Sequence, residues 1–157
     1  MPKLTMAVFS GDMDRAMAAF LIASWAAVEG WDVTMFFTFW GLGVVRDPAK
    51  KVTKKVPAEK AFDFFLPKGA DDLKLSQMHM LGFGTSMMKR RMTAKKMLPV
   101  REMMKEAKEF GVKFIACNLP MELMGIKKEE LVEEIEDTCS VGRFLEESKD
   151  ADMTLFI

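Results

Sequence analysis

The chain has 157 residues, of which 50% are hydrophobic, and its 23 basic side chains equal its 23 acidic ones in number. This composition is typical of a single globular domain covering residues 1–157. It excludes a largely disordered chain, and the balanced charge gives no reason to expect a nucleic-acid partner. Two cysteines, Cys117 and Cys139, are too few for a disulfide framework, so we expect a protein of the reducing cytoplasm.

The first forty residues predict a β-α-β unit. Residues 3–9 (KLTMAVF) and 32–40 (DVTMFFTFW) are short, almost continuously apolar runs, which is typical of strands covered on both faces. Between them, 13–28 predicts a buried helix, so the two strands should be parallel. The apolar stretch 16–28 is too short to cross a bilayer, which needs about 20 residues.

The stretch from about 44 to 92 lacks a clean periodicity and is expected to be an insertion rich in basic residues and methionine. Residues 46–60 hold six basic and two acidic side chains and predict a basic loop. Residues 61–92 predict loop and broken helix, with a short strand at 62–66. The basic segments 46–60 and 76–101 leave three interpretations open: a solvated loop, packing against a sister subunit, and peripheral contact with an anionic membrane. We favour packing against a sister subunit over peripheral contact with an anionic membrane, because no strong amphipathic periodicity is visible.

The second half of the chain shows more regular patterns. Apolar residues recur at i, i+3, i+4 and i+7 over 100–110, which predicts an amphipathic helix, and 112–117 (VKFIAC) predicts the next strand. Residues 126–137 and 140–148 predict two more helices, the first with a solvated acidic face, and 153–157 (MTLFI) predicts a buried strand. Such alternation predicts a three-layer α/β/α sandwich around a mainly parallel sheet of about five strands.

Three short segments fall at the carboxyl ends of predicted strands: Ser10-Gly11-Asp12, Trp40-Gly41 and Cys117-Asn118. Because ligands bind at the carboxyl ends of parallel strands, we expect these segments to converge on one edge of the sheet. Backbone amides from Ser10 to Asp12 suit an anion, although the same residues also suit the N-cap of the following helix.

Cys117 is the candidate reactive group. A thiol reacts as its thiolate, which a helix N-terminus favours, and the residues after Cys117 (NLPMELMG) can begin a helical turn. The local pattern also fits an inert buried cysteine, and Cys139 fits either a resolving partner or a packing residue. His79 is the only histidine and no metal-binding motif occurs, so no metal site is expected.

Three blocks of the sequence resemble one known family: FSGDMDRAMAAFLIASWAAVEGWDVTMFFTFWGL at 9–42, GVKFIACNLPMELMGIKKEEL at 111–131 and DADMTLFI at 150–157. In this order they are similar to the DsrE/DsrF/DsrH-like family, and most of all to its DsrE-like branch of sulfurtransferase or peroxiredoxin-family proteins. The resemblance implies a three-layer fold with about five parallel strands. It also implies homo-oligomers, commonly trimers or hexamers.

The resemblance further implies a sulfur relay in which Cys117 matches the sulfur-carrying cysteine, while Cys139 matches no motif position. Cys117 would accept sulfane sulfur from a donor protein as a persulfide and pass it to an acceptor protein, without a metal or organic cofactor. Amides near Asn118 and in the 10–12 loop would stabilise the charged sulfur. Trp40 and Met121 would shape an apolar pocket around it.

Two alternatives to the relay stay open on the residues alone. One is a non-catalytic oligomeric scaffold or small-ligand-binding module of the same fold. The other is a thiol redox protein that uses Cys117 with Cys139, which requires their Cα atoms to lie within about 7 Å.

Overall fold

A five-stranded, entirely parallel sheet forms the centre of the molecule in the computed structural model, which describes all 157 residues. The strand order is β4-β3-β2-β1-β5, and each neighbouring pair is parallel. The strands are β1 (Lys3–Val8), β2 (Asp32–Phe37), β3 (Lys113–Cys117), β4 (Ile135–Cys139) and β5 (Met153–Phe156). The predicted α/β sandwich and its parallel sheet are confirmed.

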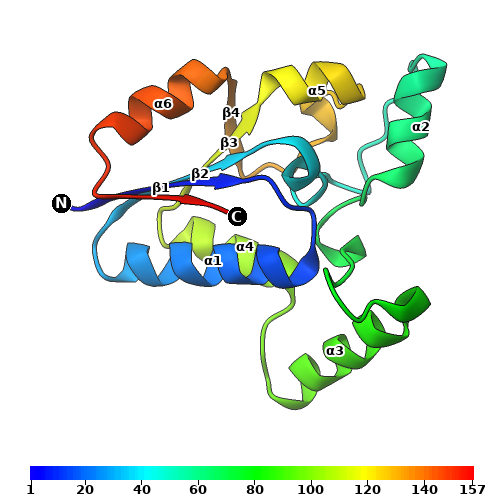
Figure 1. The fold of residues 1–157 in the computed structure, drawn as a ribbon, viewed down its shortest axis with the longest axis horizontal. Coiled ribbons are helices and arrows are strands. Elements are labelled where there is room, and N and C mark those ends of the chain that lie inside the picture. Colours follow the sequence, from blue (N-terminus) through cyan, green and yellow to red (C-terminus); the bar gives the residue numbers. More distant parts are fainter.

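One face of the sheet carries the main core. Helices α1 (Met13–Val28) and α4 (Val100–Glu109) lie together on this face (Figure 1). Alternate strand residues point toward them: the rings of Phe37 in β2 and Phe114 in β3 lie 6.2 and 5.9 Å from the ring of Phe20 in α1. These phenylalanines belong to a cluster of 32 buried apolar residues, which is the largest source of stability in the fold.

The opposite face has a thinner cover, made by α6 (Val141–Lys149) and α5 (Asn118–Met124) (Figure 1). Phe36 of β2 stacks on Phe144 of α6 with ring centroids 5.0 Å apart, but no residue of α6 is fully buried. The prediction of a buried terminal strand is wrong. Strand β5 is the outermost strand beside β1, and the side chain of Phe156 is 73% exposed.

The stretch predicted as a basic loop followed by loop and broken helix contains two helices, α2 (Pro57–Phe65) and α3 (Phe83–Ala94), and short 3-10 turns. The basic-loop prediction for 46–60 is therefore wrong over its last four residues, which form the first turn of α2. The short strand predicted at 62–66 is wrong, because α2 covers most of these residues. A proline opens this helix, and Glu59 Oε2 accepts a hydrogen bond from the Val56 N–H at 3.2 Å. Both helices stand beside the sandwich rather than on the sheet (Figure 1).

The helix predicted over 126–137 is also wrong, because this segment folds as a 3-10 turn (Lys128–Glu130) followed by β4. Its acids are not all on a solvated face. Glu130 is 2% exposed and its carboxylate lies 2.6 Å from Lys55 Nζ. Ile135 is buried and pairs with Phe114 in the sheet, so an ion pair and a sheet register override the helical pattern.

None of the helices combines the length and the hydrophobicity that crossing a membrane requires.

Candidate functional site

The ends of β1 and β2 are held together by a close backbone approach. Strand β2 ends at Phe37, three residues before the predicted end of its run, and the 3-10 turn η1 (Phe39–Gly43) follows. The Gly41 N–H donates to Phe9 O at 2.8 Å. A Cβ added at Gly41 would lie 2.0 Å from Val8 O, and one at Gly11 would lie 2.7 Å from Trp40 O. The two glycines therefore allow the loops after β1 and β2 to touch.

The loop from Ser10 to Asp12 holds itself in shape rather than capping α1 with a side chain. Ser10 Oγ donates to Asp12 Oδ2 at 2.9 Å and accepts from the Asp12 N–H at 3.3 Å. Asp12 is the N-cap residue of α1 but makes no side-chain cap hydrogen bond, and the Met13 N–H donates instead to Lys74 O at 2.8 Å. The N-cap interpretation is therefore right about position and wrong about the bond.

An open cleft of about 820 Å³ lies over these loops. Ser10, Gly11, Asp12 and Trp40 line one wall, and the aromatic residues of α2 line another. Those aromatics are Phe62, Phe64 and Phe65. Sequence reasoning missed the α2 wall, although the FDFF run that supplies it is visible once the segment is known to be helical. The charged residues of the cleft have both signs: Asp12, Arg15, Lys68, Asp72 and Lys74.

Cys117 does not line this cleft. It is the last residue of β3 and the N-cap residue of α5, as predicted, but its side chain is 0% exposed and makes no cap hydrogen bond to that helix. Because Phe114 and Ala116 point toward the main core, Cys117 points to the opposite face, the one covered by α5 and α6. Asn118 is exposed and Met121 is buried beside it in α5.

The two cysteines are direct neighbours across the sheet, an arrangement that the sequence left open as one of its alternatives. Cys117 pairs with Cys139 in the parallel register of β3 and β4, so both side chains leave the sheet on the same face. Burial is the largest cause that raises the pKa of the Cys139 thiol to about 11, and the nearby Cys117 and Asp137 contribute to the same rise. The adjacency follows from β4, whose first three residues were predicted to end a helix, with Cys139 between that helix and the next.

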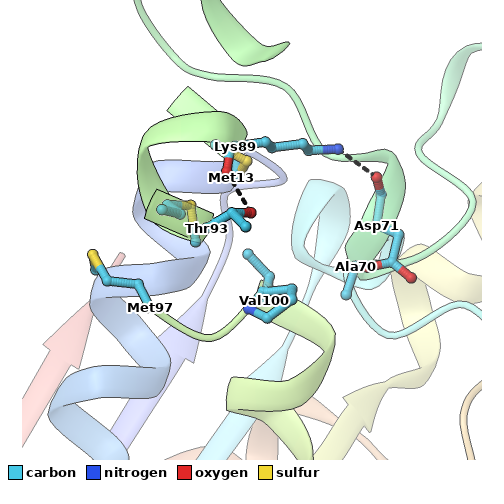
Figure 2. Close-up of a pocket in the computed structure, with 9 residues that line it drawn as sticks. Met13, Ala70, Asp71, Lys89, Thr93, Met97 and Val100 are labelled. Carbon is cyan, nitrogen blue, oxygen red and sulfur yellow. Dashed lines mark hydrogen bonds between the residues drawn. The ribbon is translucent and has the colours of Figure 1, made fainter. Parts of the chain in front are cut away.

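A second, smaller cavity of about 250 Å³ separates α3 from the starts of α1 and α4 (Figure 2). Met13, Met97 and Val100 lie around it, and Lys89 Nζ spans its rim to donate to Asp71 O at 2.8 Å (Figure 2). It contains none of the predicted site residues. Methionine packs irregular spaces well, which accounts for part of the high methionine content.

No group of three or more His, Cys, Asp and Glu residues is close enough to hold a metal ion. His79 is paired with Thr85, whose Oγ1 lies 2.7 Å from the imidazole Nδ1, at the start of α3. The site is therefore composed of a buried thiol, Cys117, paired across the sheet with the half-buried Cys139 and, beside them on the same edge of the sheet, an open aromatic cleft.

These features define an α/β sandwich that carries a thiol at the carboxyl edge of a parallel sheet. The chain belongs to the DsrE/DsrF/DrsH-like family, whose model matches residues 1–156. The resemblance read from the sequence blocks is confirmed.

Two curated relatives match over nearly their whole length. "Uncharacterized protein YrkE" of Bacillus subtilis (strain 168) is 38% identical over 155 residues, which are 99% of this chain and 96% of the relative. "Sulfur carrier protein DsrE2" of Allochromatium vinosum is 31% identical over 159 residues, covering 99% of this chain and 98% of the relative. The relationship to a sulfur carrier places the chain in a sulfur-relay family.

Two solved structures share the fold at low sequence identity. The ychN protein of E. coli superposes with a TM-score of 0.51 at 11% identity over the whole of both chains. MTH1491 of Methanobacterium thermoautotrophicum, a protein of unknown function, superposes with a TM-score of 0.51 at 12% sequence identity over 99% of each chain. This similarity supports the parallel α/β fold and nothing beyond it.

Proposed function

We propose that the chain is a sulfur carrier that holds sulfane sulfur as a persulfide on Cys117. The observation that carries the proposal is the position of this cysteine. It ends β3 at the carboxyl edge of the sheet and precedes α5 directly. Membership of the family and the sulfur-carrier relative support it.

The transfer has two balanced steps. The Cys117 thiolate attacks the outer sulfur of a donor persulfide, so that a new S–S bond forms and the donor leaves as a thiolate. The thiolate of an acceptor protein then attacks the outer sulfur of Cys117, and the Cys117 thiolate is regenerated. Donor and acceptor proteins are the partners of this reaction, and a homo-oligomer is the assembly that we propose.

Access to the sulfur depends on the thinner layer of the sandwich. Cys117 is fully buried, but the layer above it contains α6, which has no fully buried residue, and the short α5. A weakly packed helix such as α6 opens locally at low free-energy cost. We propose that separation of this layer exposes the thiol to a donor.

The test is persulfide loading followed by intact mass measurement. The reduced protein, incubated with a low-molecular-weight persulfide and then desalted, should gain the mass of one sulfur atom. Cys117→Ser should gain none, while the matched variant Cys139→Ser should still gain one. An adduct of equal yield in Cys117→Ser, or no adduct in the native chain, would contradict the proposal.

A small-ligand-binding module is the second candidate function, and the open cleft favours it because the thiol does not line that cleft. Its aromatic wall suits a planar apolar molecule: Phe64 and Phe65 are 77% and 81% exposed, and Trp40 is 46% exposed. Anilinonaphthalene sulfonate is a suitable probe. Its binding should weaken in Phe65→Ala and stay unchanged in Phe110→Ala, a half-exposed phenylalanine elsewhere. Equal binding by both variants would remove this candidate.

A further inference from the structure

Cys117 and Cys139 meet the geometric requirement for a bond between them. They are register partners at the carboxyl ends of β3 and β4. Neighbouring strands lie about 4.8 Å apart, and a disulfide needs Cα atoms separated by roughly 4.4–6.8 Å. Because both side chains leave the sheet on the same face, the two sulfurs can approach without a rearrangement of the backbone.

We propose that Cys139 is the resolving thiol of a Cys117 persulfide: it attacks the inner sulfur, closes a Cys117–Cys139 disulfide and releases hydrosulfide. The inference rests on the proposed function, because it needs sulfur on Cys117. It gives the persulfide a second fate: in the absence of an acceptor protein, the bound sulfur is released as hydrosulfide.

The step balances without an external oxidant. The bond between the two sulfurs of the persulfide breaks, and its electron pair leaves with the outer sulfur. A bond forms between the sulfurs of Cys117 and Cys139, and the proton of Cys139 moves to the leaving sulfur, which departs as HS⁻. The sulfane sulfur is reduced to sulfide while the pair of cysteines is oxidised to a disulfide. A low-molecular-weight thiol of the cell can reduce this disulfide again.

The surroundings of Cys139 favour slow discharge. Its pKa of about 11 keeps the thiol protonated at neutral pH, so the attacking thiolate is scarce. Cys139 lies on the edge strand β4, where it is half-buried, and its side chain makes no hydrogen bond. A protein acceptor with an ordinary thiol pKa therefore competes well, and discharge dominates only in its absence.

The experiment follows the loaded protein under anaerobic conditions after the donor has been removed. In the native chain, the one-sulfur adduct should decay with release of one sulfide per chain, leaving a species two hydrogens lighter than the reduced protein. In Cys139→Ser, the adduct should form to the same extent and persist roughly tenfold longer, with no internal disulfide. Cys139→Ala checks that the effect does not come from the serine hydroxyl.

The outcomes separate the two proposals. An adduct that decays equally fast in the native chain and Cys139→Ser, or a sulfur atom found on Cys139 after digestion, would overturn the inference and leave the carrier function standing. Failure of the native chain to take up sulfur at all would overturn both.

Discussion

At the scale of single residues, the edge of the sheet that carries the candidate site depends on the absence of one side chain. Gly41 lies so close to β1 that an added Cβ would sit 2.0 Å from Val8 O, a distance that real Cβ atoms do not show. The neighbour is backbone inside a parallel sheet, so it cannot move aside without weakening the register between β1 and β2.

Gly41→Ala should therefore lower the free energy of unfolding by about 3 kcal/mol, as overpacking does in a tightly packed interior. Gly142→Ala is the matched control, since the nearest atom to its new Cβ is Ser140 Oγ at 3.4 Å and the residue lies in α6. It should be neutral or stabilising by up to about 1 kcal/mol, because alanine favours helices. Urea unfolding measures both, and equal midpoints would contradict the prediction.

Cys139 leads to a prediction about pH. Its pKa is raised from 9.0 to about 11 in the folded chain, first by burial and then by Cys117 and Asp137. The unfolded chain therefore loses this proton at lower pH than the folded chain does, and stability should fall as pH rises through about 9 to 11. Comparing unfolding free energies of Cys117→Ser and the double variant Cys117→Ser/Cys139→Ser isolates this group. An identical alkaline decline in both would show that Cys139 is not its source.

At the scale of elements, a group of four charges, three of them buried, connects α2 to the rest of the chain. Arg46 and Lys55 supply the cations, and Asp63 of α2 and Glu130 supply the anions. Lys55 Nζ lies 3.3 Å from Asp63 Oδ1 and 2.6 Å from Glu130 Oε1, and the side chains of Lys55 and Glu130 are 4% and 3% exposed.

Glu130→Gln should destabilise the protein by about 3 kcal/mol, because it leaves a buried lysine with only part of its counter-charge. Lys105→Gln removes one partner of the exposed pair between Lys105 and Glu102, and it should cost less than about 1 kcal/mol. Urea midpoints compare the two variants. If Glu130→Gln lowers the free energy of unfolding no more than Lys105→Gln does, the four charges contribute little net stability.

The long-range contacts of these charges show why some elements could be predicted from the sequence and others could not. Helix α1 was predictable over its full length, because its apolar run is bounded by local signals such as Gly30, which has a φ of +86°. Strand β4 was not, because Glu130 is neutralised by Lys55, which is 75 residues away in the sequence. A helical pattern says nothing about a partner that only the folded chain brings near.

The residues of the candidate site also fall into a group that the sequence could place and a group that it could not. Ser10, Trp40 and Cys117 could be placed at the ends of strands because each follows an apolar run. Cys139 and the aromatic wall of α2 could not, since each depends on an element whose type the local pattern did not reveal. The burial of Cys117 was equally hidden, because it depends on how α5 and α6 cover the sheet.

At the scale of the whole molecule, three carboxylates connect elements that are distant in the sequence. Asp14 in α1 accepts hydrogen bonds from the backbone N–H and the hydroxyl of Ser76, at 2.8 and 2.6 Å. Burial alone would raise its pKa, but these bonds outweigh that effect and lower it below 3.8. Glu147 in α6 accepts from Lys3 Nζ at 2.7 Å, and chiefly for that reason its pKa lies below 4.5.

The pKa of Asp63 is also lowered. Burial alone would raise its pKa, yet the charge and hydrogen bond of Arg46, followed by Lys55, hold it below 3.8. For all three carboxyls the folded chain releases its proton more readily than the unfolded chain. The stability that they contribute is therefore fully present above about pH 5 and is lost as pH falls through the folded pKa values.

The free energy of unfolding should accordingly decline between about pH 5 and pH 2, and the decline should be shallower in the triple variant Asp14→Asn/Asp63→Asn/Glu147→Gln. The triple variant should also be less stable than the native chain at neutral pH, because it lacks the charged partners of Arg46 and Lys3. Glu122→Gln, an exposed position in α5 without an ion pair, serves as the control. Urea unfolding across this pH range gives the slopes. If the triple variant loses stability as steeply as the native chain, the acid sensitivity arises from groups other than these three connections between elements.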